Sequence, residues 1–370
     1  MKVGIITGRA DSGDGIARYS QNLAEELQRQ GVSVAMLACN DDQGVAEGDH
    51  HTAGGIPIKV IPRGVAASER QQLAKSWIAK QEPSVLSLQF NCHQLGDHRG
   101  ILRPFTDLYQ AAMSDLPLQI TFHELWYDAY ARGSIGGWLK GQVRKHFLRR
   151  FLRVAKPRAV MTPAEPYVAA LRRLGLGAES LPNFSNIPVT SSGIHSKLVP
   201  ARSPDFLTAS IFGTIAPQAG VDRLVAIFLQ LASTLGRKLR VFGIGRHGYE
   251  GRGWQAIVDA LGPRAECHAL GFLPDLEVSV AFQCSDVGIS VTDFAFWGKS
   301  ASVAAMLAHS LPVIFSENGR PILVIPRNGK SAVLERFAHW PHKRKEVEIT
   351  TIYQTAERCR AAFQTLITST

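Results

Sequence analysis

Short apolar runs alternate with helical patterns along nearly the whole chain, and this alternation restricts the fold more than any other feature of the sequence. The first half contains the runs VGIIT, VSVAML, SVLSLQ and LPLQITF, with helical patterns between them. The second half repeats the scheme with FLTASIFG, LRVFG, VGISV and LPVIF. Strands that alternate with helices form βαβ units around a parallel sheet. We therefore expect an α/β protein with two similar parallel-sheet halves.

A stretch without periodicity separates the two halves. It reads LPNFSNIPVTSSGIHSKLVPARSPDF and is rich in Pro, Ser and Asn, which is typical of an interdomain linker. The length of 370 residues also exceeds what a single core comfortably holds. The expected division is a first domain at 1–185, a linker at 186–206, a second domain at 207–350, and a helix at 351–370 as a candidate to pack back on the first domain.

The composition favours a globular protein of the cytoplasm. The chain has 45% hydrophobic and 19% charged residues, and no apolar run approaches the roughly 18 residues that a membrane helix needs. Its opening, MKVGIITG, looks like a buried strand and lacks the features of a signal peptide. The five cysteines are scattered, without a CxxC pair. That pattern fits a reducing compartment and argues against a zinc site.

The segment 136–158 is strongly basic. It contains eight Lys and Arg residues and no acidic residue, and its apolar residues recur near helical spacing. This pattern predicts a basic amphipathic helix with two open interpretations. Either the apolar stripe of an ordinary surface helix lies in the core, or the helix contacts an anionic partner, which is a phosphorylated acceptor or the inner face of the plasma membrane. The +10 net charge as a whole divides about evenly between the two halves, whereas a nucleic-acid reader usually concentrates its positive charge.

The tripeptide Gly298-Lys299-Ser300 stands where a strand pattern passes into a helical one. A phosphate-binding P-loop needs a glycine five residues earlier, and Asp293 occupies that position. A capped helix N-terminus with Lys299, Ser300 and Ser302 still binds anions through free amides and the positive end of the helix dipole. We expect a phosphate group there. The simpler alternatives are a solvated lysine and serines that only cap the helix.

The sequence GIGRHG at 243–248 follows a strand pattern and matches the dinucleotide-binding motif GxGxxG. That fold also requires an acidic residue that closes the next strand. Glu266 opens its strand instead. The match therefore gives little support to a dehydrogenase.

Further motifs lie at fixed places in the two halves. In the first half they are Asp14-Gly15-Ile16-Ala17-Arg18-Tyr19, Thr121-Phe122-His123-Glu124 and Pro182-Asn183-Phe184. In the second half they are Phe212-Gly213-Thr214-Ile215, Gly220-Val221-Asp222-Arg223-Leu224, Gly271-Phe272-Leu273, Ser285-Asp286-Val287 and Ala308-His309-Ser310-Leu311-Pro312-Val313-Ile314. In order and spacing this set resembles the retaining glycosyltransferases of the GT-B fold, in the family-four group. The resemblance implies two Rossmann-like parallel-sheet domains that face each other across a cleft.

The sequence departs from that family at four positions. Two basic residues that grip the donor diphosphate in the family are replaced by Thr214 and Ala219, and its two glutamates are replaced by Trp297 and Ala305. Such a chain is either catalytically silent or carries a variant site. The basic residue Lys299 at the N-terminus of the predicted helix favours the variant site.

The resemblance implies a retaining transfer of a hexose, with glucose the commonest, from a UDP-sugar to a saccharide or lipid-linked saccharide in polysaccharide, exopolysaccharide or glycoconjugate synthesis. It names His123 and Lys299 as catalytic. The donor-binding candidates are Asp14, Gly15, Arg18, Gly213, Thr214, Arg246, Phe272, Leu273, Gly298, Lys299, Ser300 and Ser302. The acceptor-side candidates are Gln89, His93 and Glu124.

No metal or other cofactor is expected, because the adjacent Asp41 and Asp42 face opposite ways in an extended chain and no clustered carboxylates follow. The alternatives are a GT-B protein that binds a nucleotide sugar without turnover and, less favoured, a sugar-nucleotide 2-epimerase.

Overall fold

The computed structural model describes residues 1–370 except 12, 127–134, 192–195, 214–220, 236, 246–251, 318–319, 328–342 and 369–370. The chain forms two compact units. The N-terminal unit comprises Met1–Pro182 together with Thr351–Thr370, and the C-terminal unit comprises Asn183–Thr350. Segment 186–206, expected as a linker, therefore lies within the C-terminal unit, where Arg202 donates to the buried Asp286 at 2.8 Å.

The N-terminal unit is built on an eight-stranded sheet in the order β3-β4-β2-β1-β5-β6-β7-β8. Its strands are β1 (Lys2–Thr7), β2 (Ser33–Asp41), β3 (Gly48–His51), β4 (Pro57–Pro62), β5 (Val85–Phe90), β6 (Leu118–Phe122), β7 (Ala159–Thr162) and β8 (Ala178–Ser180). Every described pair is parallel except β3 with β4. The chain order reverses between β1 and β5, and in such sheets ligands bind outside the carboxyl ends of the strands at the reversal.

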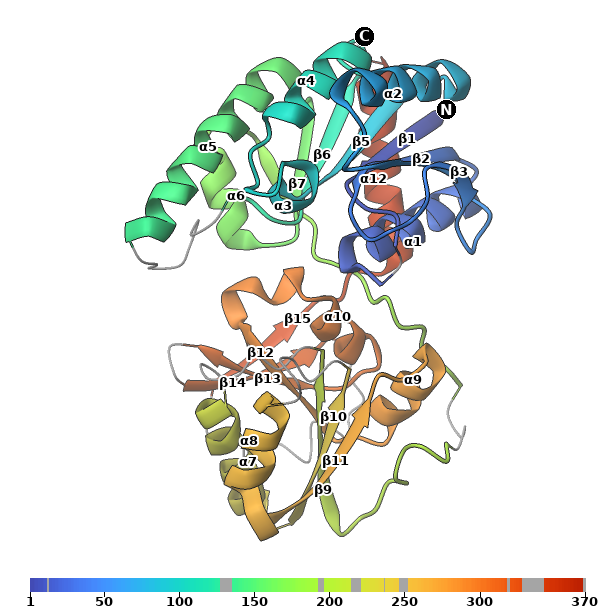
Figure 1. Cartoon of the computed structure of the whole chain (residues 1–370). Helices are drawn as coiled ribbons and strands as arrows, with labels where there is room; N and C mark the ends of the chain where they lie inside the picture. The colour runs from blue at the N-terminus through green and yellow to red at the C-terminus, as the bar shows by residue number, and fades with distance from the viewer. Residues whose placement is uncertain are drawn as a thin grey trace. The chain divides into compact units, whose positions relative to one another are not determined.

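Helices cover both faces of this sheet, which explains why β1, β2 and β5 are almost continuously apolar and buried. They are α1 (Gly15–Arg29), α2 (Ala67–Gln81), α3 (Cys92–Leu95), α4 (Arg103–Ala112), α5 (Ile135–Ala155), α6 (Glu165–Arg172) and α12 (Ile352–Thr368). The last of these, α12, packs against α1, β5 and β6 and belongs to this unit although it follows the whole C-terminal unit in the chain (Figure 1).

The C-terminal unit is built on a seven-stranded sheet in the order β11-β10-β9-β12-β13-β14-β15. Its elements are β9 (Phe206–Phe212), α7 (Val221–Leu235), β10 (Lys238–Ile244), α8 (Arg252–Leu261), η2 (Gly262–Arg264), β11 (Ala265–Gly271), α9 (Asp275–Gln283), β12 (Val287–Asp293), η3 (Phe294–Lys299), α10 (Ala301–Ala308), β13 (Val313–Glu317), β14 (Arg320–Pro326) and β15 (Arg344–Val347). Here the order reverses between β9 and β12.

Two apolar clusters fill this unit. One joins the sheet to α7 and α8 through residues such as Phe228 and Ile257, and the other joins it to α9 and α10 through Phe282 and Met306. The expected α/β architecture of two parallel-sheet domains is confirmed. The antiparallel pairs β3–β4 and β13–β14 were not expected from the alternation. Among the described helices, none has the length and apolar character of a membrane span.

Candidate functional site

Three glycines end neighbouring strands of the C-terminal sheet. Gly213, Gly245 and Gly271 follow or close β9, β10 and β11, with φ of 109°, 101° and 67°. Gly213 donates its N–H to the carbonyl of Ile244 at 2.9 Å, and Gly245 donates to Gly271 at 2.7 Å. A Cβ at Gly245 would stand 3.2 Å from the backbone N of Gly213. Positive φ and close approach both require glycine. The carboxyl edge of these strands is therefore lined by backbone and lets a ligand come close.

Helix α10 begins against this edge. A Cβ added to Gly213 would meet Oγ of Ser302 at 2.9 Å, so the end of β9 and the first turn of α10 are in contact. Ser300 is the N-cap, and its Oγ accepts from the N–H of Val303 at 3.3 Å. The first-turn amides of Ala301 and Ser302 have no acceptor inside the helix. A helix mouth of this kind favours anions.

The segment before α10 is held by Asn183. The backbone N–H of Asn183 donates to the carbonyl of Gly298 at 2.6 Å, and its Nδ2 donates to the carbonyl of Lys299 at 2.8 Å. Asp293 caps η3 by accepting from the N–H of Ala295 at 2.9 Å. The backbone from which Lys299 extends is thus fixed on both sides. Lys299 itself is half-buried.

An exposed aromatic ring stands next to the third glycine. Phe272 directly follows β11 and is 79% exposed, whereas its neighbour Leu273 is 7% exposed and packs in the core with Phe282. A large apolar ring in solvent beside a backbone-lined edge offers a flat surface on which a nucleobase can stack. Leu273 supports the loop from inside. Thr214 and Arg246 lie outside the described residues.

In the N-terminal unit, His123 follows β6 at the carboxyl edge of the sheet and is 5% exposed. Its Nε2 lies 2.9 Å from Oε1 of Gln89, and the ring of Tyr19 meets it edge-on with centroids 4.8 Å apart. Gln89 was expected on the acceptor side. The structure instead buries it completely, beneath His123.

A chain of buried side chains continues from this pair along β5 and β6. Nε2 of Gln89 donates to Oγ of Ser87 at 3.0 Å, Ser87 donates to Oε1 of Gln119 at 2.6 Å, and Nε2 of Gln119 donates to Oγ1 of Thr121 at 2.9 Å. Because Nε2 of Gln89 donates to Ser87, its Oε1 faces His123, and an amide oxygen can only accept. Nε2 of His123 must therefore carry a proton and donate to Gln89. We call these five residues the polar ladder. Sequence reasoning missed it, although the signal was present as polar residues at alternate positions of two apolar runs.

The amides in the first turn of α1 also donate hydrogen bonds, but to a protein side chain. Asp14 caps α1 by accepting from the amides of Ile16 and Ala17 at 2.9 and 3.0 Å. Its carboxylate also accepts from Gln94 at 2.9 Å and pairs with Arg9 at 3.1 Å. These contacts occupy the carboxylate as a structural cap.

Two further donor candidates lie at the start of α1. A Cβ added to Gly15 would meet nothing within 4 Å, so open space adjoins it. Arg18 lies one turn into the same helix, where its N–H donates to the carbonyl of Asp14 at 2.9 Å.

The acceptor-side candidates Glu124 and His93 lie near the ends of β6 and β5. Glu124 accepts from the hydroxyl of Tyr167 at 2.7 Å. His93 has its Nε2 3.4 Å from the guanidinium of Arg144 in α5. Burial lowers the pKa of His93, Arg144 lowers it further, and Glu124 opposes them. This shift favours the neutral imidazole, which can donate a hydrogen bond to a hydroxyl ligand or accept one from it.

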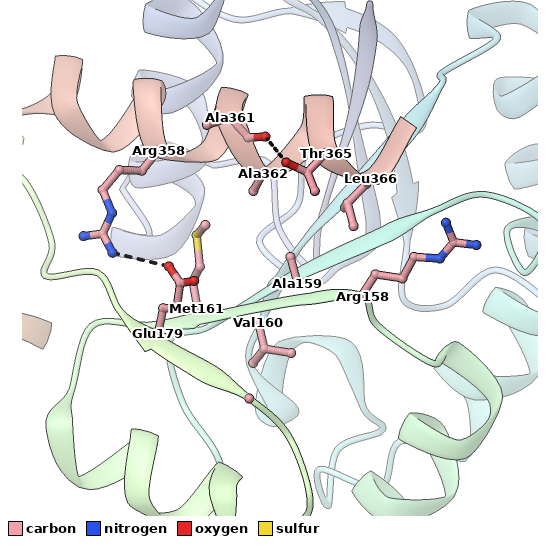
Figure 2. A pocket seen from close by; sticks show the side chains of 11 residues that line it. Arg158, Ala159, Val160, Met161, Glu179, Arg358, Ala361, Ala362, Thr365 and Leu366 are labelled. Carbon is pink, nitrogen blue, oxygen red and sulfur yellow. Dashed lines mark hydrogen bonds and ion pairs between the residues drawn. The ribbon is translucent and has the colours of Figure 1, made fainter. Parts of the chain in front are cut away.

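A pocket of about 430 Å³ lies elsewhere in the N-terminal unit. Figure 2 shows it between α12 and the strands β7 and β8, with Arg358 pointing to Glu179, 3.6 Å away. Arg358 also donates to the carbonyl of Ser180 at 2.9 Å. Its lining includes the starts of both strands, at Arg158 and Gly177. Because the site candidates follow the opposite, carboxyl ends of the strands, this pocket is separate from them. In the described part of the chain, no group of three His, Cys, Asp or Glu side chains is placed to hold a metal ion.

Comparisons with known proteins identify a related domain and the fold. Residues 14–183 match the glycosyl transferase 4-like domain. Among solved structures, WaaG, a glycosyltransferase involved in lipopolysaccharide biosynthesis, is 14% identical with a TM-score of 0.53, over 99% of this chain and 92% of that one. The lipopolysaccharide outer core galactosyltransferase WaaB is 8% identical with a TM-score of 0.53, over 99% and 91%. A glycosyltransferase from Rickettsia africae is 10% identical with a TM-score of 0.53, over 99% and 88%.

No curated protein sequence matches the chain significantly. At these identities the structural likeness establishes the fold alone, which is the GT-B fold of glycosyltransferases.

Proposed function

We propose that the protein transfers a hexose from a UDP-sugar to a saccharide or lipid-linked saccharide. The premise is that residues 14–183 match a glycosyl transferase 4-like domain and that the chain has the GT-B fold. Glucose is the sugar that we put first. The transfer retains the anomeric configuration and needs no metal ion. Its product belongs to polysaccharide or glycoconjugate synthesis.

The contact of Gly213 with Ser302 is the observation that carries this proposal. It brings a strand end that only glycine can form against a helix mouth with two amides that lack an acceptor in the helix. The diphosphate of the donor fits such a place, because its oxygens accept from the amides of Ala301 and Ser302 and from the Ser302 hydroxyl. Preorganised donors of this kind stabilise the charge that develops on a leaving group.

Lys299 adds a positive charge beside these donors. The carbonyls of Gly298 and Lys299 both accept hydrogen bonds from Asn183, so the main chain from which the ammonium group extends is held in one conformation. In this proposal Lys299 takes over part of the role of the family's two basic residues. It also supplies the charge that a metal ion provides in other transferases.

The chemical step then needs no nucleophile from the protein. The bond between the anomeric carbon and the bridging phosphate oxygen breaks, and the electron pair passes to the diphosphate. The acceptor hydroxyl forms the new bond on the same face, and its proton passes to the departing phosphate oxygen. His123 positions a hydroxyl of the transferred sugar, and Phe272 stacks on the uracil ring.

One observation favours a second candidate, a protein that binds a nucleotide sugar without turnover. At the two described positions where the family has glutamates, Ala305 is fully buried in α10 and Trp297 packs against the apolar cluster that contains Phe282. Neither side chain replaces a carboxylate. A sugar-nucleotide 2-epimerase is a third and weaker candidate.

A single set of assays separates the three candidates. The purified chain is incubated with a panel of UDP-, GDP- and ADP-sugars, with and without saccharide acceptors, and released nucleotide and sugar products are quantified. Release of UDP that depends on the acceptor, with a product of retained anomeric configuration by NMR, supports the transferase. Binding of UDP-sugar without release supports the silent protein, and interconversion of the donor without an acceptor supports the epimerase.

A further inference from the structure

Helix α5 has one face in the core of the N-terminal unit. Phe151 is fully buried and contacts the rings of Phe90, Phe105 and Tyr109, with centroids 6.3, 5.4 and 5.6 Å away. On the same helix Arg144 donates to the carbonyl of Arg99 at 2.7 Å. This inner face fixes the helix on the unit, beside α4 (Figure 1).

The beginning of α5 carries large apolar side chains that are not buried in the core. Ile135 is 81% exposed, Trp138 57%, Leu139 53% and Val143 47%. These positions recur at three- and four-residue intervals, so they lie along one stripe of the helix. An ordinary surface helix buries its apolar stripe. Here only the second half of the helix does so, and a contiguous apolar patch of this kind marks an interaction site.

Basic side chains continue the same stripe toward the end of α5. Arg149, Arg150 and Arg153 are exposed, and Arg150 and Arg153 follow Leu139 and Val143 at helical spacing. No acidic residue occurs between positions 135 and 158. The outer face of α5 thus combines an apolar first half with a basic second half. We call it the α5 outer face.

We propose that the α5 outer face docks on a lipid bilayer with an anionic surface. The apolar half enters the boundary between headgroups and acyl chains, and the three arginines contact lipid phosphates. The positive charge of the α5 outer face alone would also suit binding of a nucleic acid or a phosphorylated saccharide. Neither of these offers an apolar phase for a tryptophan, an isoleucine and a leucine beside the anionic groups, and a bilayer surface offers both. The inference uses no residue of the donor site and stands apart from the proposed transfer reaction.

Co-sedimentation with vesicles tests the proposal. The wild-type chain is expected to sediment with vesicles of phosphatidylcholine and phosphatidylglycerol much more than with phosphatidylcholine alone. Two variants probe the two halves of the face. The basic variant is Arg149→Gln with Arg150→Gln and Arg153→Gln, and the apolar variant is Ile135→Ser with Trp138→Ser and Leu139→Ser.

The basic variant should bind anionic vesicles about a hundredfold more weakly at low salt, since each cation near such a surface contributes about a fivefold factor. High salt should abolish this difference. The apolar variant should bind more weakly at every salt concentration.

A matched control removes the same charge from another surface of the unit. Arg29→Gln, Lys75→Gln and Lys80→Gln change exposed residues of α1 and α2 and should leave vesicle binding within about twofold of wild type, because charge away from the docking face is screened. Failure of the wild type to sediment, equal binding to neutral vesicles, or equal losses in the basic and control variants would each overturn the proposal. UDP binding by calorimetry should be the same in all four proteins, so a failure at the membrane is distinguishable from a failure of the proposed function.

Discussion

Gln89 accepts a hydrogen bond from Nε2 of His123 at 2.9 Å, and both residues are buried. The amide of Gln89 is oriented in turn by Ser87, which Gln119 holds from the neighbouring strand. The rotamer and the protonated nitrogen of a residue at the carboxyl edge of the sheet therefore depend on side chains deep inside it.

Replacing Gln89 by Leu should lower both stability and turnover. The change leaves the Nε2 donor of His123 without its acceptor and the hydroxyl oxygen of Ser87 without its donor, which costs about 1–3 kcal/mol of unfolding free energy. Loss of the His123 orientation should lower kcat by roughly 10-fold to 100-fold with little change in donor KM. Gln119→Leu is the matched control. It breaks the ladder further from the edge, so urea titration should show a similar loss of stability while kcat falls less. Equal kcat for the two variants would contradict the positioning role.

Lys299→Ala should leave the fold intact and lower turnover by roughly 10²–10³, as loss of one preorganised donor at the leaving group typically does. UDP affinity, measured by calorimetry, should fall less, because charge grows on the bridging oxygen as the glycosidic bond breaks. Lys238→Ala, at the exposed start of β10, is the control and should behave as wild type. A kcat within about threefold of wild type for Lys299→Ala, less than roughly 0.7 kcal/mol of barrier, would remove the lysine from the site.

The contact between Gly213 and Ser302 should be detectable in a double-mutant cycle. Gly213→Ala places a methyl group 2.9 Å from the Ser302 hydroxyl at a φ of 109°. It should weaken UDP binding and cost about 1–2 kcal/mol of stability from backbone strain alone. Adding Ser302→Gly removes the clash but not the strain, so it should restore part of the lost stability. Fully additive losses in the two single variants and the double variant would show that the residues do not touch.

The stability of the C-terminal unit should fall in mild acid through His309. Its Nδ1 lies 2.8 Å from the carbonyl of Ala305 and its Nε2 2.8 Å from Oγ of Ser279. Burial lowers the pKa of His309, against the opposing hydrogen bonds to Ala305 and Pro188. The folded state therefore binds this proton less readily than the unfolded chain, in which histidine titrates near a pH of about 6.5. Its contribution is complete above that pH and is lost as the pH falls below it.

Urea titrations between about pH 7.5 and pH 5, a range that spans the ordinary histidine pKa, measure this effect. The unfolding free energy of His309→Gln should depend less steeply on pH than that of wild type. His51→Gln, at an exposed position of β3, should keep the wild-type slope. Parallel curves for wild type and His309→Gln would refute the assignment.

If Lys299 and the amides of α10 supply the positive charge at the diphosphate, as proposed, activity should persist in excess chelator. The test is the rate of UDP release with EDTA present. A loss greater than about tenfold that Mn²⁺ restores, equal to roughly 1.4 kcal/mol of barrier, would show that a metal ion takes part.

Local patterns were predictable from the sequence, and pairings between distant segments were not. The cap at Ser300 was expected because an N-cap depends on a few adjacent residues. The burial of Gln89 was not predicted because its partner His123 follows another strand, and only the pairing of β5 with β6 brings the two together. The periodicity of α5 gave a helix but not its exposure, because the neighbours that cover a stripe decide how much of it is buried. The roles of Thr214 and Arg246 stay predictions.

The return of α12 to the N-terminal unit also sets an order of events during synthesis on the ribosome. The C-terminal unit is continuous in the chain and can fold as soon as it emerges. The N-terminal unit begins first but is completed last, since Ala356, Cys359 and Phe363 of α12 bury themselves against it only after some 170 intervening residues have been made. Until then its sheet lacks the cover that α12 gives to β5 and β6. A nascent chain halted before α12 would expose that face to chaperones while carrying a finished second unit.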